Sequence, residues 1–195
     1  ISTGMANIAE IDEAVRTIRE VGCNQFVLLK CTSTYPATPD NSNILTLPHM
    51  RELFNCEVGL SDHTMGIGVP VAAVAFGATV IEKHFTLSRA HGGIDSAFSM
   101  EPMEMKQLVI ETERAWQSLG KVKYGPTESE KGSLLFRRSI YISEDIKKGD
   151  TLTEKNLRIV RPGLGLPPKY YAVLLGSKVN RDLKKGTAFN WEMVK

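Results

Sequence analysis

Three short polar motifs carry residue types that bind metal ions and anions, and each follows a short apolar segment. The motifs are TSTY at 32–35, SDHT at 61–64 and EKHFT at 82–86. The carboxyl ends of parallel strands form the ligand-binding face of βα folds, so we expect His63 and His84 on the same rim. Neighbouring strands lie about 4.8 Å apart, which brings two imidazoles close enough to share one cation.

The residues around the two histidines suit a divalent metal with open coordination positions. Asp62 and Glu82 place carboxylates nearby, a set more typical of a catalytic metal than of a closed zinc site. The alternative is that His63 and His84 are hydrogen-bonded strand-end residues without a metal. The hydroxyl groups that could hold phosphate or carboxylate oxygens belong to Ser2, Thr3, Thr32, Ser33 and Ser61.

Alternating helix and strand signals over the first 120 residues supply the elements that would position these motifs. Apolar periodicity predicts helices at 8–21, 44–54, 69–76 and 101–119. Short apolar runs predict strands at 26–29, 58–60 and 79–81, with residues 2–4 as the end of a fourth. The alternation implies a parallel sheet with helical crossovers, either a small open sheet or half of an eight-stranded barrel.

A different pattern follows residue 120. Residues 121–136 are polar, contain Gly and Pro, and predict a linker. Beyond it, the pattern Asp-apolar-Lys-Lys-Gly occurs at 145–149 and again at 182–186. Each copy predicts a turn with glycine at positive φ. Unless the recurrence is chance, the two copies indicate a compact β-rich module built from two similar halves.

Composition limits the class of protein. A chain of 195 residues with 42% hydrophobic and 24% charged residues can bury a core, which excludes a disordered or fibrous chain. No apolar run approaches the roughly 18 residues of a membrane span, and no signal peptide is visible at the start. Three cysteines without a CxxC pair indicate a reducing compartment. We therefore expect a cytoplasmic protein with no membrane association.

Charge is divided unevenly along the chain. Residues 1–120 carry 8 Lys and Arg against 14 Asp and Glu, a net −6, whereas residues 121–195 carry 16 against 8, a net +8. The division indicates two domains, the second suited to an anionic ligand or an acidic neighbouring surface. A lysine-rich solvated surface is the alternative. We do not expect nucleic acid as a partner, because the basic residues are dispersed and lack an aromatic stacking platform.

Four motifs, CTSTYP, GLSDHTMGI, VIEKHFTL and RPGLGL, resemble the sialic acid synthase family, which condenses phosphoenolpyruvate with an N-acetylated sugar. The resemblance covers the whole chain in order. It implies an α/β fold, with the C-terminal part of a (β/α)8 TIM barrel over 1–120, a linker over 121–136 and a small β-rich antifreeze-like (SAF, β-clip) domain over 137–195. The chain would then lack roughly the first half of the barrel and the family's phosphoenolpyruvate-binding lysines, so we expect it to be inactive alone.

Within that family, the chain looks most like the pseudaminic acid synthases. LLKCTSTYPA, IDSAFSMEP and GLPPKYY resemble them more than N-acetylneuraminate synthases. The implied acceptor is 2,4-diacetamido-2,4,6-trideoxy-L-altrose. An N-acetylneuraminate or legionaminic acid synthase remains an alternative, because a few loop residues decide the acceptor. A non-catalytic carbohydrate-binding fragment is another, and a different metal-dependent aldolase would leave the C-terminal module unexplained.

The same resemblance assigns roles to individual residues. His63 and His84 become ligands of a divalent metal, manganese with magnesium or cobalt as alternatives, and Glu82 beside them completes the catalytic group. The residues expected to contact phosphoenolpyruvate or the acceptor are Ser2, Ser33, Tyr35, Ser61 and Asp95. A salt-bridged strand-end Glu82 and a loop-capping Asp95 are the structural alternatives.

Arg161 of the RPG motif matches an arginine that the antifreeze-like domain of one subunit lends to the active site of another. The resemblance therefore implies a domain-swapped homodimer. The uneven charge and the polar linker suit that arrangement. The alternative is that residues 161–163 form only a turn.

The residue types fit the implied chemistry. A metal would polarise the open-chain aldehyde as a Lewis acid. The C3 atom of phosphoenolpyruvate attacks that carbon, water adds at C2, and the tetrahedral intermediate loses phosphate by C–O cleavage. Hydroxyl and cationic groups would stabilise the phosphate and the carboxylate of this substrate.

Overall fold

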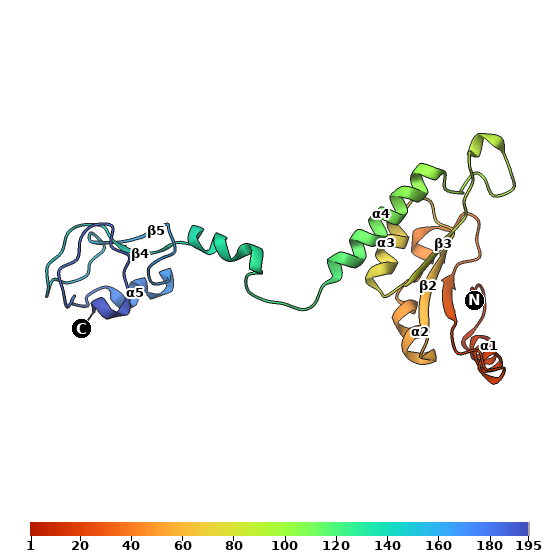
Figure 1. The fold of residues 1–195 in the computed structure, drawn as a ribbon, viewed down its shortest axis with the longest axis horizontal. Coiled ribbons are helices and arrows are strands. Elements are labelled where there is room, and N and C mark those ends of the chain that lie inside the picture. Colours follow the sequence, from red (N-terminus) through yellow and green to blue (C-terminus); the bar gives the residue numbers. More distant parts are fainter. Residues whose placement is uncertain (195) are drawn as a thin grey trace. The chain divides into compact units, whose positions relative to one another are not determined.

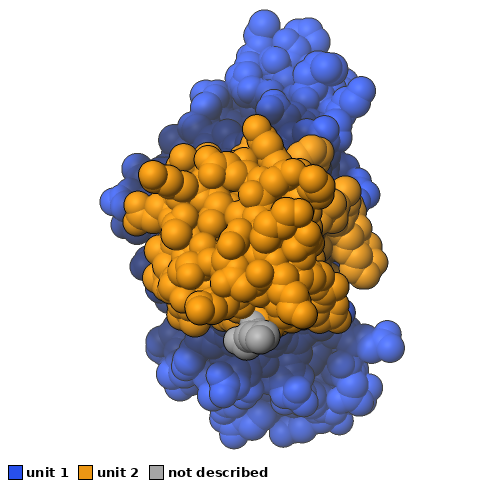
Figure 2. Space-filling model, turned by 90° about the vertical axis from the view of Figure 1, so that its left-hand side faces the viewer, with its two compact units in different colours: residues 1–121 blue, residues 122–195 orange. Residues whose placement is uncertain are grey.

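The computed structural model describes residues 1–194, and the chain divides into two compact units, Ile1–Lys121 and Val122–Lys195 (Figures 1 and 2). The first unit is α/β and the second is built mainly from short strands and turns. Across the described residues, no helix combines the length and apolar character needed to cross a membrane. Each unit has a hydrophobic core of its own.

The first unit contains a three-stranded parallel sheet in the order β1–β2–β3. β1 (Val27–Cys31), β2 (Glu57–Asp62) and β3 (Val80–Lys83) run in one direction, because α2 (Thr46–Phe54) and α3 (Gly68–Ala75) return the chain between them (Figure 1). The predicted parallel sheet with helical crossovers is confirmed. Each strand continues past its apolar run to the polar motif that follows it.

The start of the chain extends this sheet beyond β1. Ser2 bridges Leu29 in parallel, and the Thr3 N–H donates to the Leu29 carbonyl at 2.9 Å. Helix α1 (Ile8–Glu20) follows, and the Asn7 side chain caps its first turn. The segment at 2–4 therefore occupies a fourth strand position, as predicted.

The connection after β3 leads to the longest helix of the first unit. It contains the 3-10 helix η2 (Arg89–His91), and another 3-10 helix, η1 (Pro39–Asn41), lies between β1 and α2. Helix α4 (Pro102–Leu119) begins with proline at its first position, preceded by Glu101 in a capping box. This start fixes the C-terminal end of the loop that follows β3.

Apolar side chains between the sheet and its helices form the core of the first unit. Its buried members are Val15, Leu28, Leu47, Met50, Phe54, Val58, Leu60, Ala73 and Ala78. Side chains alternate between the two faces of a strand, so the helix-facing residues of β1 and β2 leave the alternate positions for the other face. Gly59 occupies one of these, where a Cβ atom would lie only 2.4 Å from the Val80 carbonyl oxygen.

The second unit is built around a short antiparallel pair, β4 (Ser139–Ile142) with β5 (Leu157–Val160). Its short helices are η4 (Pro168–Tyr170), α5 (Tyr171–Leu174) and η5 (Trp191–Met193). The buried residues of its core are Ile140, Ile142, Ile146, Leu152, Leu157, Leu174, Val179, Leu183 and Phe189. These residues come from both halves of the unit, so strands, turns and helices share one core.

The repeated Asp-apolar-Lys-Lys-Gly motif forms two turns that bind each other. Each aspartate accepts from the ammonium of the first lysine and the backbone N–H of the second lysine in the other copy, at 2.7 to 2.9 Å. The pairs are Asp145 with Lys184 and Lys185, and Asp182 with Lys147 and Lys148. Ile146 and Leu183 form an antiparallel bridge, and Gly149 and Gly186 have φ of +91° and +86°. The two halves therefore meet as similar copies, and the predicted positive φ is confirmed.

The polar segment expected to be a linker is partly helical. The 3-10 helix η3 (Glu128–Phe136) occupies its second half, and Thr127 with Glu130 forms a capping box at its start. The Gly163 N–H donates to the Leu135 carbonyl at 2.9 Å, which ties η3 to the turn after β5 within the second unit. The structure differs from the expected linker because polar caps, rather than apolar periodicity, define this helix.

Candidate functional site

The polar motifs after β1, β2 and β3 meet at the carboxyl-terminal edge of the parallel sheet. The last paired residues of β2 and β3 are Ser61 with Glu82 and Asp62 with Lys83. His63 and His84 follow directly, and their ring centroids lie 5.1 Å apart. The structure therefore brings together the two histidines that the sequence places on one rim.

His63 is buried, and its Nδ1 atom is engaged. Only 7% of the residue is exposed. Nδ1 lies 2.9 Å from the Thr32 carbonyl oxygen and 4.0 Å from the Cys31 sulfur. A carbonyl oxygen only accepts, so Nδ1 carries the proton and Nε2 keeps a free lone pair. Metal-binding imidazoles adopt this arrangement, in which the other ring nitrogen donates to a protein oxygen.

Near His84 a carboxylate takes the place of the carbonyl, at a longer distance. Its Nδ1 lies 3.5 Å from Asp95 Oδ2. A carboxylate beside Nδ1 orients an imidazole and leaves Nε2 for a metal. The sequence predicts that Asp95 contacts the acceptor sugar, whereas the structure places its carboxylate beside His84.

The loop that carries Asp95 is anchored by Arg89. The Arg89 backbone N–H donates to Glu101 Oε1 at 2.8 Å, and its Nε donates to the Ser99 carbonyl at 3.0 Å. Its guanidinium also pairs with Glu104, and this hydrogen bond lowers the pKa of the Glu104 carboxyl. The loop is thereby fastened to the first turn of α4, which holds Asp95 near His84.

Glu82 lies on the same face of the sheet as Ser61. The two residues are paired across β2 and β3, and Ser61 Oγ donates to Glu82 Oε1 at 2.6 Å. Glu82 is exposed at the rim, whereas Ser61 is buried. The hydroxyl expected to bind phosphoenolpyruvate is therefore bound to the carboxylate expected to act in catalysis.

Asp62 does not belong to the group around the histidines. Adjacent strand residues face opposite sides, and Asp62 Oδ2 forms an ion pair with Lys83 Nζ at 2.9 Å, both side chains being 2% exposed. Thr64 also donates to Asp62 through its backbone N–H and its hydroxyl, each at 3.0 Å. The expectation that Asp62 supports a metal beside His63 is therefore wrong. Lys83 was not among the expected site residues, because its local sequence does not indicate which residue of the neighbouring strand it pairs with.

Two aromatic rings pack around the imidazoles. The ring centroid of Tyr35 lies 4.4 Å from that of His63 and 5.8 Å from that of His84. The Phe98 ring lies 5.0 Å from His84 and 5.9 Å from Tyr35. Tyr35 is 55% exposed and can meet a substrate, whereas Phe98 is 8% exposed and supports the rings from behind. Phe98 stands in the IDSAFS motif, which marks the subfamily but gives no role to this residue.

Ser33 and the start of the chain lie side by side at the same edge. A Cβ atom on Gly4 would lie 3.3 Å from Ser33 Oγ, and Ser33 Oγ lies 3.8 Å from the Cys31 sulfur. Ser2, two residues before Gly4, bridges Leu29 on β1. Ser2 and Ser33 therefore lie on adjacent segments, an arrangement that suits joint binding of one anion.

Arg161 lies in the second unit, directly after β5. The turn that carries it is held by the Ser139 hydroxyl, which donates to the Pro162 carbonyl at 2.8 Å. Arg161 itself is exposed. Leu164, three residues further along the chain, is 65% exposed. Phe136, at the end of the helix η3 that is bonded to this turn, is 69% exposed.

The two imidazoles provide a donor set that fits a divalent metal. With Nδ1 of His63 bonded to Thr32 and Nδ1 of His84 near Asp95, the Nε2 atoms are left to accept. Within residues 1–194, no cluster of three or more His, Cys, Asp or Glu side chains forms a closed ligand set. Two nitrogen ligands leave coordination positions for water and substrate oxygens, as in catalytic rather than structural metal sites.

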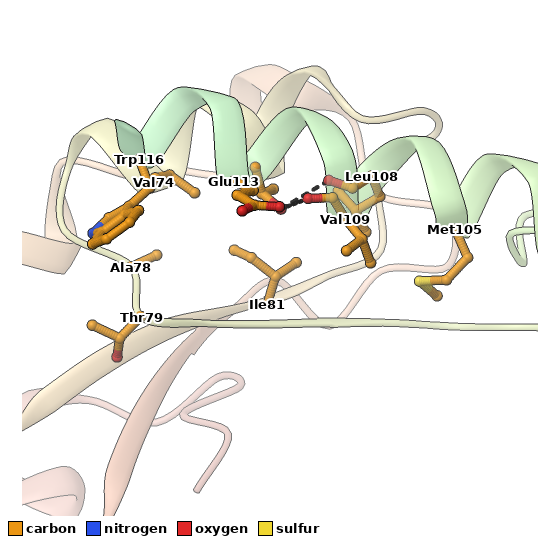
Figure 3. A pocket seen from close by; sticks show the side chains of 10 residues that line it. Val74, Ala78, Thr79, Ile81, Met105, Leu108, Val109, Glu113 and Trp116 are labelled. Carbon is orange, nitrogen blue, oxygen red and sulfur yellow. Dashed lines mark hydrogen bonds between the residues drawn. The ribbon is translucent and has the colours of Figure 1, made fainter. Parts of the chain in front are cut away.

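A separate groove of about 570 Å³ lies between α3, α4 and β3 (Figure 3). Its lining is mostly apolar, and the Thr112 hydroxyl there is bound to the Leu108 carbonyl at 2.8 Å. The lining residues are Val74, Ala78, Thr79, Ile81, Met105, Leu108, Val109, Thr112, Glu113 and Trp116. The predicted site residues are absent from this lining, so the groove is distinct from the candidate site.

Comparisons with known proteins match both units. Residues 1–124 match the model of the NeuB family, and residues 137–195 match that of the SAF domain. The pseudaminic acid synthase of Campylobacter jejuni is 43% identical over 188 residues, which cover 96% of this chain and 55% of that protein. The N,N'-diacetyllegionaminic acid synthase of Legionella pneumophila is 39% identical over 199 residues, which cover 100% of this chain and 56% of that protein.

The fold also resembles a solved structure. The spore coat polysaccharide biosynthesis protein SpsE of Bacillus subtilis has a TM-score of 0.59 and 32% sequence identity, covering 100% of this chain and 60% of that one. The chain thus spans little more than half the length of the relatives that it matches.

Proposed function

This chain belongs to the NeuB family and carries a SAF domain, and on that premise we propose that the full-length protein condenses phosphoenolpyruvate with an N-acetylated amino sugar. The observation that carries this proposal is the pair of adjacent imidazoles at the sheet edge, with Nδ1 of His63 bonded to Thr32 and Nδ1 of His84 near Asp95. The two nonulosonic acid synthases at 43% and 39% identity support the same class of reaction.

We propose 2,4-diacetamido-2,4,6-trideoxy-L-altrose as the acceptor and pseudaminic acid as the product. The relative from Campylobacter jejuni is named a pseudaminic acid synthase. The exposed ring of Tyr35, backed by the buried Phe98, gives the rim an apolar character that suits a 6-methyl group. Legionaminic acid synthesis is the second candidate, favoured by the 39% identity to the synthase of Legionella pneumophila.

His63 and His84 would hold the metal through their Nε2 atoms, with manganese proposed and magnesium or cobalt as alternatives. Such an ion, when bound, would polarise the aldehyde of the open-chain sugar. Thr32 keeps a proton on Nδ1 of His63, and the Asp95 carboxylate, 3.5 Å away, would attract one to Nδ1 of His84. Glu82, already bound by Ser61, would accept a hydrogen bond from a sugar hydroxyl or from the water that adds.

Phosphoenolpyruvate would lie along the serine side of the same edge. The hydroxyls of Ser2 and Ser33 would donate to its phosphate and carboxylate oxygens, and Ser61 would join them when its hydroxyl turns away from Glu82. A bond forms between its C3 atom and the aldehyde carbon, water adds at C2, and C–O cleavage releases phosphate. The serines keep the two anionic groups fixed while C2 changes from trigonal to tetrahedral.

The SAF unit of one subunit would complete the site of a second copy in a homodimer. Arg161 is exposed on a turn flanked by exposed Leu164 and Phe136, a combination that suits docking on another surface. The net charges of −6 over residues 1–120 and +8 over residues 121–195 favour such contact. The planar guanidinium would bind a carboxylate or other polar groups of the substrates.

The proposal is tested by the acceptor that the full-length protein uses. With phosphoenolpyruvate and the trideoxy-altrose, we expect a product with the mass of pseudaminic acid and one phosphate released per product. N-acetylmannosamine carries a 6-hydroxyl, and an apolar pocket should reduce its kcat/KM by about 100-fold. A higher kcat/KM with N-acetylmannosamine would assign the protein to N-acetylneuraminate synthesis, and condensation with neither sugar would overturn pseudaminic acid as the product.

A further inference from the structure

A buried ion pair lies behind the two histidines. Lys83 precedes His84 and Asp62 precedes His63, and the Nζ–Oδ2 distance of this pair is 2.9 Å. Both side chains are 2% exposed. Because strand residues alternate between faces, the pair lies on the side of the sheet opposite to the histidines.

Every polar atom of this pair has a partner. The three N–H bonds of Lys83 go to Asp62 Oδ2, the Thr64 carbonyl and the Gly66 carbonyl. Asp62 Oδ1 accepts from the Thr64 backbone N–H, and Oδ2 accepts from the Thr64 hydroxyl as well as from Lys83. A buried pair with this many bonds fixes the backbone around it, because breaking any of them leaves a buried polar group unsatisfied.

The pair is also the last link between β2 and β3. The backbone ladder between the two strands ends at Asp62 and Lys83. Beyond that point the chain segments bond elsewhere: the His63 carbonyl accepts from the Ala37 N–H at 3.0 Å, and the His84 carbonyl accepts from the Met100 N–H at 2.8 Å. The Lys83 side chain therefore joins the end of β3 to the turn at 62–66, which carries His63.

We propose that the Lys83–Asp62 ion pair is a positioning device that sets the spacing of His63 and His84, and thereby the affinity of the metal site. This inference rests on the proposed function, because it assumes that the two imidazoles share one ion. Neither Lys83 nor Asp62 touches a substrate. An apolar pair of similar size could be equally stable, but it could not bind the Thr64 and Gly66 carbonyls.

The test measures Co²⁺ binding to metal-free, full-length protein by calorimetry and by the visible absorption of the bound ion. We expect Lys83→Met to weaken binding by about 10- to 100-fold, as loss of supporting bonds does at metal sites, and to change the absorption spectrum. The matched control is Val58→Ala, which opens a cavity in the core at the far end of β2, where Val58 is 0% exposed. It should lower the melting temperature and leave the Kd for Co²⁺ within about twofold of the unsubstituted protein.

A second variant guards against loss of the fold in Lys83→Met. The double substitution Lys83→Met with Asp62→Leu leaves no unpaired buried charge, so it should fold while still binding Co²⁺ about tenfold or more weakly. Co²⁺ affinity and spectrum unchanged in a folded Lys83 variant, with binding lost in His63→Ala, would overturn this inference and leave the proposed metal site standing. Absence of Co²⁺ binding to the unsubstituted protein would overturn both.

Discussion

The chemistry of two ring nitrogens decides what this site can bind. The Thr32 carbonyl can only accept, so it holds a proton on Nδ1 of His63, and the carboxylate of Asp95 lies 3.5 Å from Nδ1 of His84. The Nε2 atoms are then left to face a cation. Two neutral imidazoles attract a divalent cation without the charge of carboxylate ligands, which leaves the ion a stronger Lewis acid toward an aldehyde oxygen.

This arrangement predicts the tautomer of His63. In the metal-free, full-length protein, ¹⁵N chemical shifts should show His63 with its proton on Nδ1, because Thr32 accepts from that atom at 2.9 Å. His91 is exposed and serves as the control, with the tautomer mixture of a free imidazole. A proton on Nε2 of His63 would contradict the geometry on which the metal site depends.

Part of the site follows from local sequence, and part depends on register. The adjacency of His63 and His84 is predictable, because polar residues after buried strands gather at one edge of a parallel sheet. The role of Asp62 is not, since an acid next to a histidine in sequence points to the other face. Phe98 and Lys83 acquire their roles only from contacts with residues on other elements.

At the scale of elements, two kinds of contact hold the parts in place. In the first unit, parallel register and the Arg89-anchored loop bring strand ends and Asp95 together. In the second unit, the two Asp-apolar-Lys-Lys-Gly turns are joined by hydrogen bonds to their aspartate carboxylates. The pKa of Asp145 is lowered mainly by the side-chain hydrogen bond from Lys184 and next by the backbone hydrogen bond from Lys185. The backbone N–H of Lys148, then the Lys147 side chain, lowers that of Asp182.

These shifts predict how the second unit responds to acid. A carboxyl whose folded pKa lies below its unfolded value of 3.8 stabilises the fold above that value, and the gain is lost as pH falls through the folded pKa. Compared with the unsubstituted chain, Asp145→Asn/Asp182→Asn should therefore melt at a lower temperature at pH 7, and the difference should shrink below about pH 4. Thermal unfolding between pH 7 and 2 measures this.

The control for the acid response is Glu154→Gln, which removes one exposed carboxylate outside the paired turns. Its melting curve should follow that of the unsubstituted chain at every pH. A difference in melting temperature between the double variant and the unsubstituted chain that stays constant from pH 7 to 2 would contradict this. It would show that protonation of the two aspartates does not change the stability of the second unit.

Most elements were predictable from periodicity, and the exceptions have a common cause. Apolar runs predict β1, β2 and β3, although each strand extends into polar residues such as Asp62 and Lys83. Apolar periodicity does not predict helix η3, because its start is defined by Thr127 and Glu130 rather than by an apolar face. The hydrogen bonds between the two Asp-apolar-Lys-Lys-Gly turns could not be predicted, since the repeat alone does not show that each copy binds the other.

For the whole molecule, the family resemblance and the fold class are confirmed. Residues 1–124 match the NeuB family and residues 137–195 the SAF domain, in the order that the motifs imply. The net negative charge of the first part and the net positive charge of the second would then favour association of two copies, because opposite charges attract. Assembly of two copies would place Arg161 where substrate anions bind.

The proposed assembly predicts complementation between two inactive variants. Full-length His63→Ala and Arg161→Ala proteins should each be inactive, yet regain activity when co-expressed. If Arg161 acts across the dimer, one of the two sites in each mixed dimer keeps both residues, so we expect about a quarter of the unsubstituted activity. No recovery, with mixed dimers verified by mass, would place Arg161 in its own subunit's site or outside any site.

Metal titration of the full-length protein tests the central claim most directly. After removal of all metal, condensation of phosphoenolpyruvate with the trideoxy-altrose should cease, and one equivalent of Mn²⁺ per subunit should restore it. His63→Ala and His84→Ala should stay inactive at every Mn²⁺ concentration while keeping the melting temperature of the metal-free protein. Full turnover without metal, or in either histidine variant, would contradict the account of a synthase whose metal is held by these two imidazoles.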